Sequence, residues 1–120
     1  MNRSANKIEN RVLSCSCDDE LRGLRALILE SQGSTVVSAK TSGDAVREMN
    51  GSRFDVLLLC YQYGAADFKL MFDEFRRLFP GGRIVAIEFP QTSCDGCVPD
   101  IIVSAHAPAE MVKAVTTGPN

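Results

Sequence analysis

The chain has 120 residues, a formal net charge of −2 and a hydrophobic content of 45%. This length suits one domain, and the apolar content can form a core without the help of disulfides. The slightly acidic balance provides no basic field, so we expect no nucleic-acid partner. No apolar run approaches the roughly 18 residues of a membrane span, and residues 1–10 lack the apolar segment of a signal peptide. Together with an odd count of 5 cysteines, these features favour a cytoplasmic protein with reduced thiols and no membrane contact.

Five short apolar runs predict five β-strands. Each is rich in β-branched residues or leucine, and the third and fourth are almost continuously apolar, as strands buried on both faces are. In chain order the predicted strands cover residues 11–15, 34–39, 54–60, 83–89 and 100–105. The polar ends predict a disordered leader over residues 1–9, a folded domain over 10–115 and a tail over 116–120.

Helical patterns lie between and after these runs. They cover residues 18–33, 41–50, 66–79 and 108–115. Asp18 or Ser16 is the expected N-cap of the first helix. The spacing of its apolar residues predicts a buried face that consists of Leu21, Leu24, Leu27 and Ile28.

Strands that alternate with helices predict a parallel sheet with helices on both faces. Sites on such sheets lie beyond the C-terminal ends of the strands, which is where Cys60 ends the third run. The connection between the last two strands is different, because its ten residues, PQTSCDGCVP, contain two prolines and a glycine. Since these residues oppose a helix, we expect the fourth helix to be shortened or missing.

The layout and several local strings resemble the receiver domain of two-component response regulators. The resemblance covers residues 10–115 and is strongest over RVL, DDELRGLRALILESQG and STVVSAKTSGDAVREMNGSRFDVLLL. It implies a flavodoxin-like, doubly wound sheet of five parallel strands in the order 2-1-3-4-5. In that family, a histidine kinase passes a phosphoryl group to an aspartate at the end of the third strand.

The residues that carry this chemistry in the family can be placed one by one. The phosphoacceptor position falls on Cys60. The acidic pair that holds Mg²⁺ falls on Ser16 and Cys17 when the first helix is aligned through ELR, and a shift of one or two residues would bring in Asp18 and Asp19. The Thr or Ser position at the end of the fourth strand falls on Glu88, and the Lys position falls on Ser104, counting back from Pro108.

None of these positions keeps its family residue. A thiol does not replace the phosphoacceptor carboxylate, and Mg²⁺ prefers several hard oxygen ligands that this set lacks. The resemblance therefore implies a pseudo-receiver that binds no Mg²⁺ or other cofactor and is no enzyme. We expect it to act by contact with a protein partner in a signalling pathway. A rival interpretation keeps true phosphotransfer through Asp18, Asp19 or Asp55, although Asp55 begins its strand and lies far from the site.

The cysteines allow another interpretation. Cys17 and Cys60 are expected at the same edge of the sheet, and the loop above it contains Cys94 and Cys97 in a CDGC motif. Four thiolates can form a closed zinc site, and a thiol of lowered pKa can act as a redox switch. The alternative function is therefore a thiol redox-sensing or metal-binding receiver-like domain that uses Cys17, Cys60, Cys94 and Cys97. The simplest interpretation is that these side chains only fill apolar space.

Overall fold

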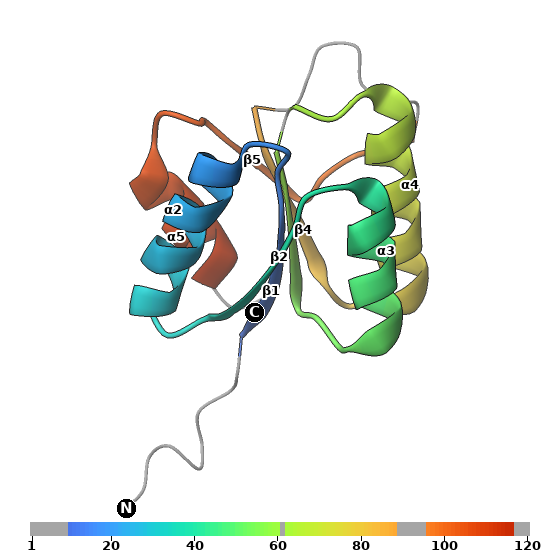
Figure 1. Ribbon diagram of the computed structural model, residues 1–120, viewed down its shortest axis with the longest axis horizontal. Coiled ribbons are helices and arrows are strands. Elements are labelled where there is room, and N and C mark those ends of the chain that lie inside the picture. The colour runs from blue at the N-terminus through green and yellow to red at the C-terminus, as the bar shows by residue number, and fades with distance from the viewer. Residues whose placement is uncertain (1–9, 61, 89–95, 117–120) are drawn as a thin grey trace, which may run out of the picture.

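A computed structural model describes residues 10–60, 62–88 and 96–116 of the chain. Its strands form one parallel sheet in the order β2-β1-β3-β4-β5, as predicted (Figure 1). The strands are β1 (Arg11–Cys15), β2 (Thr35–Ala39), β3 (Val56–Cys60), β4 (Arg83–Ile87) and β5 (Ile101–Val103). The helices are α2 (Asp19–Ser31), α3 (Ser42–Gly51), α4 (Ala65–Leu78) and α5 (Pro108–Thr116).

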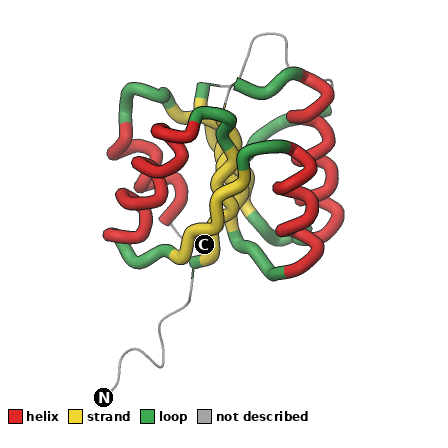
Figure 2. The backbone as a smooth tube through the Cα atoms, in the orientation of Figure 1, coloured by secondary structure: helices red, strands yellow, loops and turns green. Residues whose placement is uncertain are grey.

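The sheet lies between two layers of helices, with α2 and α5 on one face and α3 and α4 on the other (Figures 1 and 2). Alternate strand residues supply the two cores. Leu57 and Leu59 pack with the side chains of α3 and α4, whereas Leu58 packs on the side of Leu29 and Met111, which belong to α2 and α5. This explains the continuous apolar run of β3, because all five of its residues are buried.

The helix ends follow from local chemistry. Asp18 caps α2, since its carboxylate accepts a hydrogen bond from the amide of Leu21 at 3.0 Å. Thr41 caps α3 in the same way through the amide of Asp44 at 3.0 Å. The last helix extends to Thr116, which the sequence had assigned to the tail; the predicted leader and the rest of that tail lie outside the described residues.

The predicted buried face of α2 was wrong in part. Leu24 and Leu27 are 54% and 68% exposed, whereas Arg25 and Leu29 are buried. The helix lies against the sheet along the line of Arg25 and Leu29, four residues apart, so the two leucines point outward. Apolar spacing alone cannot detect this, because it assigns an arginine to the solvent face.

The connection between β4 and β5 departs from the βαβ pattern. Residues 96–100 contain no helix, and residues 89–95 lie outside the described part of the chain. The strand that follows has only 3 residues, and its central Ile102 is 57% exposed.

At the other end of the sheet, an open cavity of about 650 Å³ lies over the starts of β4 and β5 and the end of α5. Over the described residues, no helix is both long and apolar enough to span a membrane.

Candidate functional site

The candidate site lies at the C-terminal ends of β1 and β3, which are neighbours in the sheet. Cys60 is the last residue of β3, as predicted, and is fully buried, with 0% of its surface exposed. Ser16 follows β1 and is also 0% exposed, whereas the next residue, Cys17, is exposed. The parallel pairing of β1 with β3 therefore brings together three of the residues predicted from the resemblance.

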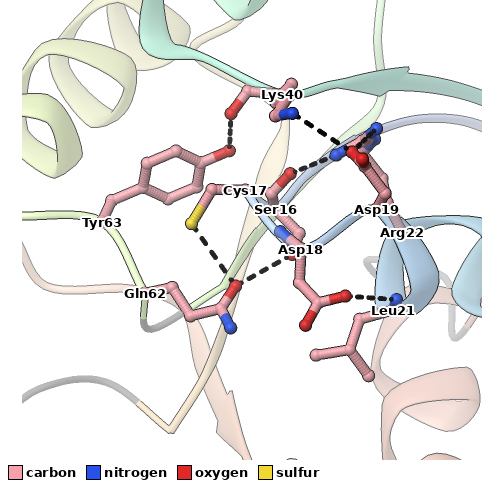
Figure 3. Close-up of polar contacts among 9 residues, drawn as sticks. All are labelled: Ser16, Cys17, Asp18, Asp19, Leu21, Arg22, Lys40, Gln62 and Tyr63. Atoms are coloured by element: carbon pink, nitrogen blue, oxygen red, sulfur yellow. Dashed lines mark hydrogen bonds and ion pairs between the residues drawn. The ribbon is translucent and has the colours of Figure 1, made fainter.

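The side chain of Gln62 connects these three residues, and Figure 3 shows its contacts with Ser16 and Cys17. Its Oε1 atom accepts hydrogen bonds from Ser16 Oγ at 3.2 Å, from Cys17 Sγ at 3.5 Å and from Cys60 Sγ at 3.6 Å. An amide oxygen has two lone pairs, so the three donors share it. The hydrogen bonds are neutral, and they hold the ends of the two strands in one network.

The nearby acidic residues are already engaged in other contacts. Asp18 caps α2, as described above, and its own amide donates to Ser16 Oγ at 3.2 Å. Asp19 pairs with Arg22 at 2.7 Å and with Lys40 at 3.5 Å. The hydrogen bond from Arg22, together with the charge of Lys40, lowers the pKa of Asp19 from its ordinary value. Both carboxylates therefore stabilise the start of α2 and are turned to partners other than Cys60.

Tyr63 closes one side of the site. It is only 8% exposed, and its hydroxyl donates to the backbone oxygen of Lys40 at 2.7 Å (Figure 3). Burial, above all, raises the pKa of Tyr63 well beyond its usual range. The contact ties the loop that follows β3 to the residue that follows β2.

The other two predicted positions stand apart from this network. Glu88 follows β4 with a positive φ of 49°, and its amide donates to the backbone oxygen of Val103 at 2.8 Å. Ser104 follows β5, and its hydroxyl accepts from the amide of His106 at 3.1 Å. Each residue thus contributes to the local backbone geometry at the end of its strand.

The cysteines differ in their surroundings. Cys15 is a core residue, and its burial strongly raises its pKa, so that it remains a thiol. Cys97 is 3% exposed and disulfide-bonded, which departs from the expected reduced thiols and leaves this residue no free thiolate for a metal ion. Cys94 lies outside the described residues. Within the described segments, no three His, Cys, Asp or Glu side chains form a group that could hold a metal ion. The metal-binding alternative is therefore not favoured, and Cys17 and Cys60 are free thiols that contact Gln62, which gives no specific support to the redox alternative.

The donors at the site also do not suit Mg²⁺. Cys60 and Cys17 present sulfur, and the hard oxygens beside them are a neutral hydroxyl and a neutral amide, from Ser16 and Gln62. Mg²⁺ is normally held by carboxylates in near-octahedral geometry. What this arrangement provides is a closed, uncharged junction between strand ends.

Sequence reasoning missed Gln62 as the centre of the site. The available signal was its position two residues after Cys60, in the loop that leaves the end of a central strand. A polar residue there faces the end of β1, and its amide can accept from thiols and hydroxyls alike.

The arrangement of strands and helices is the flavodoxin-like fold of CheY-like receiver domains, and solved structures of such domains are similar over most of the chain. No protein-family model and no curated protein matches the sequence. A response regulator from Burkholderia pseudomallei with a phosphorylated aspartic acid has a TM-score of 0.76 and 17% identity, covering 91% of this chain and 68% of its own. A receiver domain from Methanospirillum hungatei has a TM-score of 0.74 and 18% identity, covering 88% of this chain and 90% of its own.

A third similar structure is the receiver domain of a sensor histidine kinase from Pseudomonas aeruginosa, with magnesium in its active-site cleft. It has a TM-score of 0.72 and 17% identity, and it covers 90% of this chain and 95% of its own. At these identities the likeness establishes the fold, and the function has to be argued from the site.

Proposed function

We propose that this chain is a pseudo-receiver, a signalling module with the receiver fold that is not phosphorylated and acts by binding a protein partner. The observation that carries the proposal is the buried thiol of Cys60 at the end of β3, held by Gln62 Oε1 at 3.6 Å. Two of the similar structures hold a phosphorylated aspartic acid or magnesium. Here the equivalent strand ends present sulfur, a hydroxyl and a neutral amide.

The chemistry of phosphotransfer supports the same conclusion. The developing charge on a transferred phosphoryl group is normally stabilised by metal ions and cationic side chains. Two cations at this edge of the sheet, Arg22 and Lys40, both pair with Asp19 (Figure 3). Glu88 follows β4 at the position where receivers have a hydroxyl and would repel a phosphoryl group. We therefore assign the chain no enzymatic activity and no cofactor, and we propose that it works in the cytoplasm.

Acetyl phosphate provides the test. The purified chain is incubated with acetyl phosphate and Mg²⁺ and then examined by intact-mass spectrometry, with a phosphorylatable receiver domain as positive control. We expect the mass of this chain to stay unchanged. A phosphoryl adduct that disappears in Asp18→Asn or Asp19→Asn would overturn the proposal in favour of true phosphotransfer. An adduct that disappears in Cys60→Ala would also overturn it, because the thiol itself would be the acceptor.

A further inference from the structure

A buried arginine lies in a groove between α2 and α5, on the face of the sheet opposite α3 and α4 (Figure 1). Arg25 is only 6% exposed. It lines a cavity of about 70 Å³ together with Leu21, Leu24, Ile28, Ile87, Ser104, Ala105, Pro108 and Met111. This cavity is separate from the network around Gln62.

The guanidinium of Arg25 has no hydrogen-bond or ion-pair partner among the described residues. The other buried or half-buried arginines do have partners; Arg22, for example, binds Ser16 and Asp19. Within the described chain, the one fully buried side-chain nitrogen or oxygen without a partner is Ser14 Oγ. The unpartnered nitrogens of Arg25 are therefore not fully buried, and the residue lines the cavity.

An unpaired charge in such a position is costly. An arginine stays charged at any ordinary pH, and a largely buried charge without a partner is destabilising unless an opposite charge reaches it. Among the residues that the structure describes, no acidic side chain lines the cavity. Glu110 belongs to the first turn of α5 but lines the larger cavity over β5, on the other side of that helix. Because none of the described residues supplies this opposite charge, an anionic group of another molecule can reach Arg25 through the cavity.

We propose that the Arg25 cavity binds a carboxylate side chain, Asp or Glu, presented by a partner protein. This inference rests on the proposed function, since it gives the protein contact a place and a chemistry. A guanidinium matches a carboxylate in a bidentate pair. A volume of about 70 Å³ with a single cation and mostly apolar walls suits one carboxylate. A phosphate group normally recruits several donors.

The surface around the cavity predicts which residues flank the acidic side chain on the partner protein. Leu24, at 54% exposed, forms part of the wall, and Leu27, at 68% exposed, lies one turn further along α2. Large apolar side chains beside a desolvated charge favour apolar residues on the partner that flank its acid and exclude water. The partner segment is therefore expected to be amphipathic, with one acid between apolar side chains.

The first test uses sodium acetate as the probe. The side-chain Nε–H signals of the arginines are followed by NMR in the unphosphorylated, Mg²⁺-free chain, with sodium chloride at equal ionic strength as reference. We expect the Arg25 signal to shift and to reach saturation. The concentration at half-saturation should be about tenfold lower for acetate than for chloride, because only acetate can form a bidentate pair with the guanidinium. Arg47, which is exposed and already paired with Asp44 on α3, is the internal control. An Arg25 signal that does not respond, or that responds more strongly to inorganic phosphate, would overturn the proposal.

The second test uses a helical peptide with one glutamate between leucines, and its twin with glutamine in that place. Wild type is expected to prefer the glutamate peptide about tenfold, and Arg25→Met should abolish the preference. The urea midpoint of Arg25→Met should equal or exceed that of wild type, because no partner is lost. A large fall in that midpoint would show that Arg25 is structural, and a preference that persists without the guanidinium would show that the glutamate binds elsewhere; either result overturns the proposal. Phosphorylation by acetyl phosphate would refute the proposed function and leave these results intact.

Discussion

Replacement of Cys60 by aspartate is the most direct perturbation of the candidate site, because it restores the residue type that phosphorylated receivers use. The side chain is 0% exposed, and the side chain that contacts it, Gln62, is neutral. Burial without a nearby free cation disfavours the charged form, so the introduced carboxyl should have a raised pKa in the folded state. Gln62 can rotate its amide to donate one hydrogen bond, which offsets part of the loss.

We expect Cys60→Asp to lower the free energy of unfolding by about 1–3 kcal/mol near neutral pH, the range for a poorly compensated buried polar group. With a urea slope of about 1–3 kcal/mol per molar, the midpoint should fall by about 1 M. The folded-state pKa is raised, so the penalty should be present at neutral pH and shrink as pH falls through that pKa. Urea melts under reducing conditions, followed by circular dichroism at several pH values, measure both effects.

Two matched variants isolate the charge. Cys60→Asn has nearly the shape of aspartate without the charge, and its penalty should not change with pH. Cys60→Ala removes a small side chain and should cost about 1 kcal/mol. If Cys60→Asp is as stable as wild type and becomes more stable when Mg²⁺ is added, the site is a working metal pocket and the reasoning is refuted.

Two further substitutions test the packing around the site and the sheet. Gln62→Ala should lower the free energy of unfolding by about 1–2 kcal/mol, because it leaves buried Ser16 Oγ without its acceptor; an unchanged urea midpoint would mean that the amide contributes nothing. Gly82→Ala should cost about 1–3 kcal/mol, because its Cβ would lie 2.8 Å from Phe75 Cε2 and 3.2 Å from the backbone oxygen of Phe79. Gly81→Ala is the control, because a Cβ there meets nothing within 4 Å. Thermal melts compare the two variants, and equal midpoints would contradict the clash expected between the Cβ at position 82 and Phe75.

The fold could be predicted from the sequence because its signals are local and repeated. The continuous apolar run of β3 and the capping residues Asp18 and Thr41 each indicate one element, and their alternation fixes a parallel sheet. The site was harder to predict. Cys60, Ser16 and Cys17 were placed by resemblance, but Gln62 carries no motif, and its role depends on the distance between two strand ends. Arg25 was missed for a related reason, since its burial depends on how α2 lies on the sheet.

The outer edge of β5 affects the tendency of the chain to aggregate at high protein concentration. An outermost strand carries backbone amides and carbonyls that can pair with a strand of another molecule and seed aggregation. Here that strand has only 3 residues, and Pro99, two positions before Ile101, has no amide hydrogen to donate. A foreign strand would find too few consecutive hydrogen bonds to hold it. The shortness of β5 therefore disfavours strand addition at this edge of the sheet, even though Ile102 is open to solvent.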